Sequence, residues 1–228
     1  MVALEEEPIF IQYVFFALDP AWRRLAESER TCATTELREL IERQRSITTY
    51  GYTTTGLKAG TDFMLWRSGP DLAAIQAATN ELVKTRLGAY LSIPYAYVGL
   101  IRPSTYVRRQ QPQEQAALQK ERGRYLVIYP FTKTDEWYQL SKATRQGMMN
   151  EHIKIGHDYS TIRQVLVHSF GLDDQEFVVA YEMEDLPAFQ SLVMDLRSTD
   201  GRPYTKRDTP VFTAVYRSLE ETLDLVAG

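Results

Sequence analysis

The sequence lacks most of the marks of a secreted, membrane-bound or zinc-stabilised protein. Cys32 is the only cysteine, so the chain forms no internal disulfide, and no group of cysteines and histidines has the spacing of a zinc finger. No apolar run approaches the roughly 20 residues that span a bilayer. Residues 1–8 carry glutamates where a signal peptide has basic residues. We therefore expect a cytoplasmic protein with no membrane partner.

An excess of positive charge is also missing. The 26 Lys and Arg residues are outnumbered by 30 Asp and Glu, which gives a formal net charge of −4. Such a chain has no overall field to hold a polyanion, so we expect no nucleic-acid partner. With 228 residues, of which 44% are hydrophobic, it is long and apolar enough for one or two domains with a core.

The common catalytic motifs are absent as well. The sequence has no glycine-rich phosphate loop, no dinucleotide-binding fingerprint, no zinc-binding pair of histidines one helical turn apart and no Gly-x-Ser-x-Gly turn. These absences exclude most routine enzyme classes.

What is present is an ordered series of strand and helix patterns. In the first half, residues 9–17 predict a strand, the apolar spacing up to Ile41 predicts a helix, and the rest predicts a hairpin over 46–66, a helix from Asp71 and a strand over 95–101. The second half predicts the same order again: a strand over 125–131, a helix over 137–156, a hairpin over 161–182, a helix over 187–196 and a strand over 211–216.

The two halves also share residues, which indicates an internal repeat. Gly56-Leu57, Phe63 and Asp71-Leu72 correspond to Gly171-Leu172, Phe177 and Asp185-Leu186. We predict an α+β fold made of duplicated ferredoxin-like (βαββαβ) repeats that form a dimeric α+β barrel within one subunit. The expected boundaries are 1–107 for the first half, 108–124 for a polar linker and 125–228 for the second half.

His152 is the most informative of the three histidines. It falls on a predicted helix, with Met148 and Met149 one turn earlier and Gly156 one turn later. An imidazole on such an apolar face either packs in the core or binds something, and from the residues alone the packed histidine is the commoner case.

The second half closely resembles the chlorite dismutase and coproheme decarboxylase family. The resemblance is carried, in order and spacing, by Tyr129-Pro130-Phe131-Thr132-Lys133, Trp137-Tyr138-Gln139-Leu140, Arg145-Gln146-Gly147-Met148-Met149-Asn150-Glu151-His152 and Ser169-Phe170-Gly171-Leu172-Asp173-Asp174. It implies the duplicated ferredoxin-like subunit and a homo-oligomeric ring, typically a pentamer. The first half resembles the family mainly in architecture, plus Pro103-Ser104-Thr105-Tyr106.

The resemblance implies that His152 is the proximal ligand of a haem iron. A carboxylate commonly orients the other nitrogen of such a histidine. Asp200 is our candidate for that carboxylate, and the alternative is that Asp200 only shapes the turn with Gly201.

On the opposite side of the haem, the resemblance separates two branches. Members that split chlorite place an arginine on the strand before the Gly-Leu-Asp-Asp turn, and counting back from Gly171 that position is Gln164. Coproheme decarboxylases of one subgroup carry a glutamine there, together with a tyrosine and a lysine that match Tyr129 and Lys133. Arg163 keeps the alternative open, because a shift of one residue in a strand exchanges its two faces.

The substrate that the resemblance implies is iron coproporphyrin III (coproheme), with hydrogen peroxide as the oxidant. Tyr129 would form a radical, and two propionates would lose carbon dioxide and become vinyl groups, which gives haem b. Lys133, Arg197 and Tyr106 match positions that contact propionates, whereas Arg108 and Arg109 are only guesses for a further contact. Taken singly, Lys133 and Arg197 would be read as solvated surface charges.

Three other functions stay open at this point. The chain could be a chlorite dismutase-like enzyme or weak peroxidase with Arg163 in its pocket, a haem-binding or haem-transfer protein without catalysis, or a protein that keeps only the fold and binds no haem.

Overall fold

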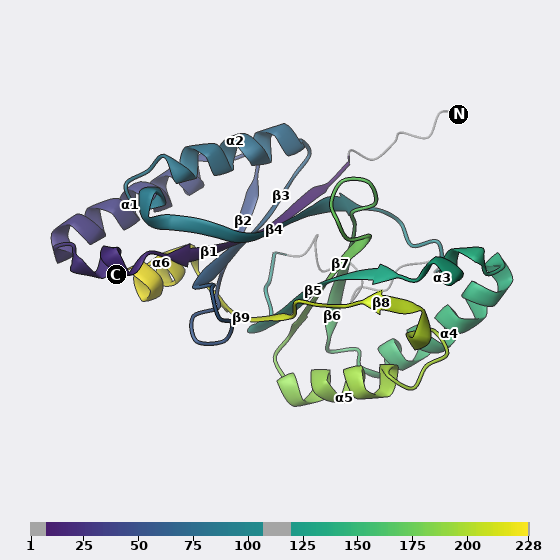
Figure 1. Cartoon of the computed structure of the whole chain (residues 1–228). Helices are drawn as coiled ribbons and strands as arrows, with labels where there is room; N and C mark the ends of the chain where they lie inside the picture. The colour runs from purple at the N-terminus through teal and green to yellow at the C-terminus, as the bar shows by residue number, and fades with distance from the viewer. Residues whose placement is uncertain (1–7, 107–119, 228) are drawn as a thin grey trace. The chain divides into compact units, whose positions relative to one another are not determined.

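The computed structural model describes residues 8–106 and 120–227, which form two compact units (Figure 1). The first unit comprises the described residues up to Ile101 together with 214–227, and the second unit comprises those between Arg102 and Thr213. The C-terminal segment thus groups with the first unit, whereas the sequence analysis assigned it to the second half. Most of the expected linker, 108–124, lies outside the described residues. None of the described helices is long and apolar enough to cross a membrane.

The first unit is a four-stranded antiparallel sheet with helices. Its elements are β1 (Phe10–Leu18), α1 (Glu27–Arg43), β2 (Thr48–Thr53), β3 (Phe63–Gly69), α2 (Leu72–Val83), β4 (Leu91–Ile101) and the C-terminal α6 (Leu219–Ala227). Strand β1 pairs with both β3 and β4, and β2 pairs with β3, so the order is β4-β1-β3-β2. The end of β9 (Phe212–Arg217) adds to the free edge of β2.

The second unit has the same plan. Its elements are β5 (Tyr125–Lys133), α3 (Asp135–Gln139), α4 (Lys142–Asp158), β6 (Arg163–His168), β7 (Phe177–Met183), α5 (Leu186–Leu196) and β8 (Thr205–Arg207). The sheet order is β6-β7-β5-β8, again antiparallel.

The element order β-α-β-β-α-β therefore occurs twice, and the predicted α+β class is confirmed. The closure of the two halves into one barrel stays a prediction. Three details differ from the sequence analysis: the helix expected over 137–156 is broken into α3 and α4, and neither β8 nor α6 was anticipated. The break lies at Ser141, whose hydroxyl caps α4 by accepting the N–H of Thr144 at 3.1 Å.

The second helix of each β-α-β-β-α-β repeat begins with the same kind of N-terminal cap. Asp71 and Asp185 cap α2 and α5, because each carboxylate accepts a backbone N–H of the first turn, from Ala73 and Ala188. The turn between β6 and β7 needs Gly171, which has a φ of 69° that a side chain would oppose.

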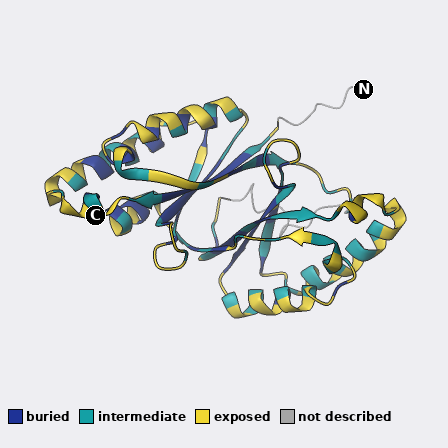
Figure 2. Cartoon of the chain, viewed as in Figure 1, coloured by how far each residue is buried: buried dark blue, intermediate teal, exposed yellow. Residues whose placement is uncertain are grey.

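The core of the first unit explains why the C-terminal helix belongs to it. Buried residues of β1, β3 and α1 form one apolar cluster with Leu223 and Ala227 of α6, and Figure 2 shows dark blue parts within these otherwise mixed-colour elements. The Trp22 indole N–H donates to the Ala227 carbonyl at 2.7 Å inside this cluster. Helix α6 therefore completes the first unit although the whole span of the second unit, residues 102–213, lies between α6 and the other elements of the first unit in the chain.

Removing the apolar contact of α6 should destabilise the first unit. Leu223 is 2% exposed and Leu225, on the same helix, is 64% exposed. We expect Leu223→Ala to lower the free energy of unfolding by about 2–5 kcal/mol through lost burial and a cavity, and Leu225→Ala to change it by less than about 0.5 kcal/mol. Urea unfolding followed by circular dichroism measures both, and equal effects would show that α6 does not complete the core.

Candidate functional site

One face of the second unit's sheet brings together several residues that the sequence analysis selected. Tyr129 on β5 lies opposite Val179 on β7, and Tyr181, two residues further along β7, lies opposite Gln164 on β6. Residues opposite or two apart share a face, so Tyr129, Tyr181 and Gln164 point to the same side. Side chains of this face, including Tyr129 and Tyr181, pack with residues of α4 and α5.

The same register puts Arg163 on the other face. Arg163 lies opposite Glu182, and its guanidinium is 3.6 Å from the buried carboxylate of that residue. The shift of one residue that the sequence analysis left open is therefore decided: Gln164 is on the face of Tyr129, and Arg163 is not.

Helix α4 crosses this face without burying any of its own residues, and Figure 2 shows it in teal and yellow alone. Helix α1 has the same length and the same place in the first repeat, but it buries Leu37 and Ile41. Counted from the first residue of each helix, the matching positions of α4 are His152 and Gly156. A Cβ on Gly156 would find no atom within 4 Å. The second unit therefore leaves space where the first is filled.

The uncovered face is also apolar. Leu166, in the middle of β6 and two residues from Gln164, is 38% exposed although it points toward the helix side. Met148 and Met149 on α4 are only half-buried. Apolar surface that a strand and a helix leave open on facing sides is typical of a site for a flat, largely apolar ligand.

The His152 ring is uncharged at neutral pH. Burial, and after it the positive charge of Lys133, lowers the pKa of His152 to about 4, although Glu151 acts in the opposite direction. Within the described parts of the chain no hydrogen bond reaches the ring. A neutral imidazole with an unused nitrogen lone pair is the form that binds a metal.

Asp200, our candidate partner for His152, makes a different contact. Its backbone N–H donates to the carboxylate of Glu151 at 3.1 Å. The segment of Asp200 is thus tied to the helix one residue before His152, through its main chain.

Lys133 ends β5 close to the same helix. Its amine lies over the Trp137 ring, 4.6 Å from the centroid, and 3.4 Å from the Thr205 hydroxyl. Its backbone N–H donates to Glu176 at 2.8 Å. Burial, with a smaller contribution from Arg202, lowers the pKa of Lys133 to about 8, so the amine is mostly charged at pH 7.

The Tyr129 hydroxyl sits in a buried setting with charges of both signs. Burial, and with a smaller effect the charge of Asp208, raises the pKa of Tyr129, whereas a side-chain hydrogen bond with Tyr181 and the charges of Arg197 and Arg202 act against that rise. Arg197 lies 3.6 Å and Arg202 lies 2.6 Å from one carboxylate, that of Asp208. The phenol therefore stays protonated at neutral pH.

Tyr106 lies beside the start of α4. Its carbonyl accepts a hydrogen bond from the Gln146 amide at 3.0 Å. Nearby, the Tyr138 hydroxyl donates to Glu176 at 2.5 Å, and burial raises the pKa of Tyr138. Arg108 and Arg109, the guesses for a further contact, lie outside the described residues.

Four residues of this neighbourhood were not predicted from the sequence, namely Glu176, Tyr181, Arg202 and Asp208. Tyr181 had a signal in the alternation of β7, which puts it on the face of Phe177. The other three can be identified only from their contacts with residues that are distant in the sequence.

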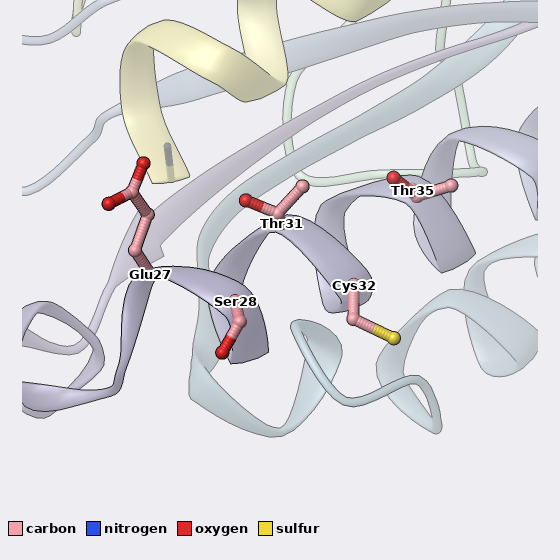
Figure 3. Close-up of a pocket in the computed structure, with 5 residues that line it drawn as sticks. All are labelled: Glu27, Ser28, Thr31, Cys32 and Thr35. Carbon is pink, nitrogen blue, oxygen red and sulfur yellow. The ribbon is translucent and has the colours of Figure 1, made fainter.

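The structure argues against two other kinds of site, a bare metal centre and a pocket in the first unit that contains the predicted residues. No cluster of three or more His, Cys, Asp or Glu that could hold a bare metal ion occurs in the described ranges. A surface hollow in the first unit is lined by five residues of α1, including Cys32, and Figure 3 shows them along that helix. None of the predicted site residues lies in it.

Comparisons with known proteins agree with this picture. The family model described as "Chlorite dismutase" matches residues 30–217. A coproheme decarboxylase of Mycolicibacterium smegmatis is 33% identical over 173 residues, which cover 75% of this chain and 74% of that protein. A chlorite dismutase of Candidatus Nitrospira defluvii, solved in complex with imidazole, is similar in structure with a TM-score of 0.89 and 26% identity, over 96% of this chain and 95% of that one. An arginine-to-lysine variant of the same enzyme has a TM-score of 0.89 and 27% identity, over 99% of this chain and 98% of that one.

The His152 ring should titrate far below an ordinary histidine in the porphyrin-free protein. We expect an NMR titration of its ring protons to show a midpoint near pH 4 in place of 6.5, with His152→Gln used to assign the signal. Because the unfolded chain then binds the proton more tightly, stability should fall as the pH drops from 6.5 toward 4. A midpoint near 6.5 would show that the ring is solvated and not held against the sheet.

Proposed function

This chain belongs to the chlorite dismutase family, and from that premise we propose that it is a haem-dependent coproheme decarboxylase. It would convert two propionates of iron coproporphyrin III to vinyl groups with hydrogen peroxide and release haem b. The observation that supports this most is the combination on one face of a half-buried, protonated Tyr129 with an uncharged Gln164, beneath a helix that carries a neutral His152.

The residues present fit an iron porphyrin. A porphyrin supplies four nitrogen ligands to its iron, so the protein needs to supply only one further ligand, such as a neutral imidazole. A cluster of metal-binding side chains is therefore unnecessary. The half-buried methionines of α4, the open space at Gly156 and the exposed Leu166 offer apolar contact to a flat macrocycle. His152 would be the iron ligand.

The four carboxylates of coproheme call for cations in a partly buried place. Arg202 lies close enough to Lys133 for its charge to lower the pKa of the lysine, and Arg197 shares Asp208 with Arg202. We infer that Lys133 and Arg197 hold propionates, with the Tyr106 hydroxyl as a further donor. The side chain of Arg197 is half exposed, and its guanidinium lies 3.6 Å from the Asp208 carboxylate. A propionate of the substrate can therefore compete with Asp208 for this guanidinium.

Tyr129 would carry the reaction to the substrate. Bound coproheme, with peroxide, supplies the oxidising power and the propionates that react. Tyr129 gives up its phenolic hydrogen as a proton and an electron, and then takes a hydrogen atom from the β-carbon of a propionate. For each propionate, one hydrogen peroxide and one proton are consumed, and one vinyl group, one carbon dioxide and two waters are formed.

Chlorite chemistry is the second candidate, because the solved relatives named above are chlorite dismutases. Gln164 argues against it, since a neutral amide does not attract an anionic oxidant as an arginine does. Arg163 is held on the opposite face by Glu182.

A pentameric assembly and a cytoplasmic location stay predictions.

The decisive experiment loads the purified protein with iron coproporphyrin under anaerobic conditions and adds hydrogen peroxide stepwise. We expect mass spectrometry of the porphyrin to show two successive losses, each of the elements of formic acid. Tyr129→Phe should lower the rate of both by at least about 100-fold, because phenylalanine has no hydrogen to donate.

Tyr125→Phe is the matched control for this experiment, since Tyr125 is on the same strand and the same face as Tyr129. It should keep the rate within about twofold. A porphyrin that stays intact in the wild-type protein would refute the decarboxylase, and oxygen release from chlorite in the same preparation would support the second candidate.

The charge of Lys133 should make carboxylate binding depend on pH. Because the pKa of Lys133 is about 8, raising the pH through 8 removes the charge, so the affinity for metal-free coproporphyrin should fall by about tenfold between pH 7 and 9. Fluorescence titration measures this affinity without any redox reaction.

Lys133→Met should bind weakly at both pH values and lose the dependence, whereas Lys206→Met, which changes an exposed lysine of β8, should behave as the wild type. A wild-type affinity that does not change with pH would show that Lys133 does not hold a propionate.

A further inference from the structure

Tyr181, on β7, is a buried tyrosine in direct contact with Tyr129. It is 7% exposed and belongs to the apolar cluster of the second unit, together with Leu192 and Phe189 of α5. The rings of Tyr181 and Tyr129 stack, with their centroids 6.2 Å apart and their planes at 30°. On its other side, the Tyr181 ring contacts Phe189 at 5.2 Å. Tyr129 thus has a second phenol beside it, one ring deeper in the core.

A hydrogen bond joins the two hydroxyls, and Tyr181 is its donor. The bond lowers the pKa of Tyr129 and raises the pKa of Tyr181. A donor has the first effect on its acceptor, and an acceptor has the second effect on its donor. In the described parts of the chain, Tyr181 is the one side chain whose hydrogen bond acts on the pKa of Tyr129. The oxygen of Tyr129 therefore holds the hydrogen of Tyr181, while its own hydrogen is free to leave.

Both phenols stay neutral in these surroundings. Burial raises the pKa of Tyr129 and raises the pKa of Tyr181 well above its ordinary value, because a phenolate would be a charge in an apolar interior. A tyrosine that loses a proton and an electron together becomes an uncharged radical. The transfer of a whole hydrogen atom between the two hydroxyls is therefore a redox step that this pair can undergo without burying a charge.

The fold does not require a hydroxyl at position 181. Counted from the first residue of each strand, Tyr181 of β7 matches Arg67 of β3, so the repeat does not fix the residue type. The cluster around the ring is apolar, and a phenylalanine would fill nearly the same volume with no hydroxyl to satisfy. What the hydroxyl adds is its bond to Tyr129.

We propose that Tyr181 is a second redox-active tyrosine, which stores the oxidising equivalent of Tyr129. This inference rests on the proposed function, in which coproheme and hydrogen peroxide remove one proton and one electron from Tyr129. The O–H bond of Tyr181 then breaks, its hydrogen forms a new O–H bond on Tyr129, and the unpaired electron moves to Tyr181. No acid, base or further oxidant takes part. The reverse step returns the radical to Tyr129 when a propionate is in position.

A store is useful because the proposed substrate reacts twice. The second propionate has to reach Tyr129 after the first has reacted, and a radical waiting on the half-buried Tyr129 is open to side reactions. Tyr181 is enclosed by apolar side chains of β7 and α5, so a radical there is kept away from water and other partners.

The direct test is electron paramagnetic resonance of the full chain loaded with haem b and frozen after the addition of hydrogen peroxide. Haem b is the proposed product, so no decarboxylation consumes the radical. We expect the wild-type protein to show two tyrosyl signals, because the spectrum of a tyrosyl radical depends on the torsion between its ring and its Cβ. Tyr181→Phe should show one signal, which decays about tenfold faster.

The matched control is Tyr125→Phe. Tyr125 lies on the same face as Tyr129, but its ring lies beneath the Arg124 guanidinium, at 5.2 Å, and the variant should keep both signals. A single tyrosyl signal that is the same in the wild type and in Tyr181→Phe would overturn the store.

The peroxide consumed per vinyl group formed is the second readout. With coproheme bound, Tyr181→Phe should consume about twofold more peroxide per vinyl group than the wild type, because radicals that cannot be stored are lost. A hydroxyl that only positions Tyr129 would slow the reaction and leave this ratio unchanged, which would contradict a store. Decarboxylation without a second radical refutes the store alone, whereas a wild-type protein that forms neither vinyl groups nor a tyrosyl radical refutes the proposed function as well.

Discussion

A helix of 17 residues that buries none of them needs a partner other than its own sheet. An isolated helix of this length is marginal in water, and most helical stability in proteins comes from packing an apolar face. Met148, Met149 and Ile155 give α4 such a face, but they reach only half burial. The proposed porphyrin supplies the missing contact, so the same feature that weakens the packing of the second unit makes room for its ligand.

The electrostatics of the second unit follow from the same opening. Burial without full packing keeps His152 neutral and Lys133 only mostly charged, because neither side chain has full access to water. Arg197 and Arg202 share the single carboxylate of Asp208, which leaves the neighbourhood of Tyr129 with an excess of positive charge. That excess favours an anionic ligand, whereas an apolar filling of the space would leave it uncompensated.

Much of the fold was within reach of the sequence, because strand and helix patterns are local and the repeat was visible in Gly56-Leu57 and Gly171-Leu172. Tyr129, Lys133 and His152 were found through motifs whose spacing is fixed along single elements. The face on which Gln164 lies could not be found in this way, since it depends on which residue of β7 lies opposite Gln164. Arg202, Asp208 and Glu176 were missed because an ion pair or hydrogen bond between distant residues leaves no local pattern. The position of α6 in the first unit is likewise a tertiary fact, carried by Leu223 and the Trp22 contact.

The two repeats solve the same packing problem in opposite ways. The first fills the layer between helix and sheet with Leu37 and Ile41. At the matching positions the second has His152 and Gly156, which leave more space between helix and sheet. In the proposed function, His152 is also the residue that binds the iron. A duplicated fold can bear this loss because one copy keeps its complete core. The cost of an open site then falls on the second unit alone, whose stability should depend on what it binds, whereas the stability of the first unit is set by its own side chains.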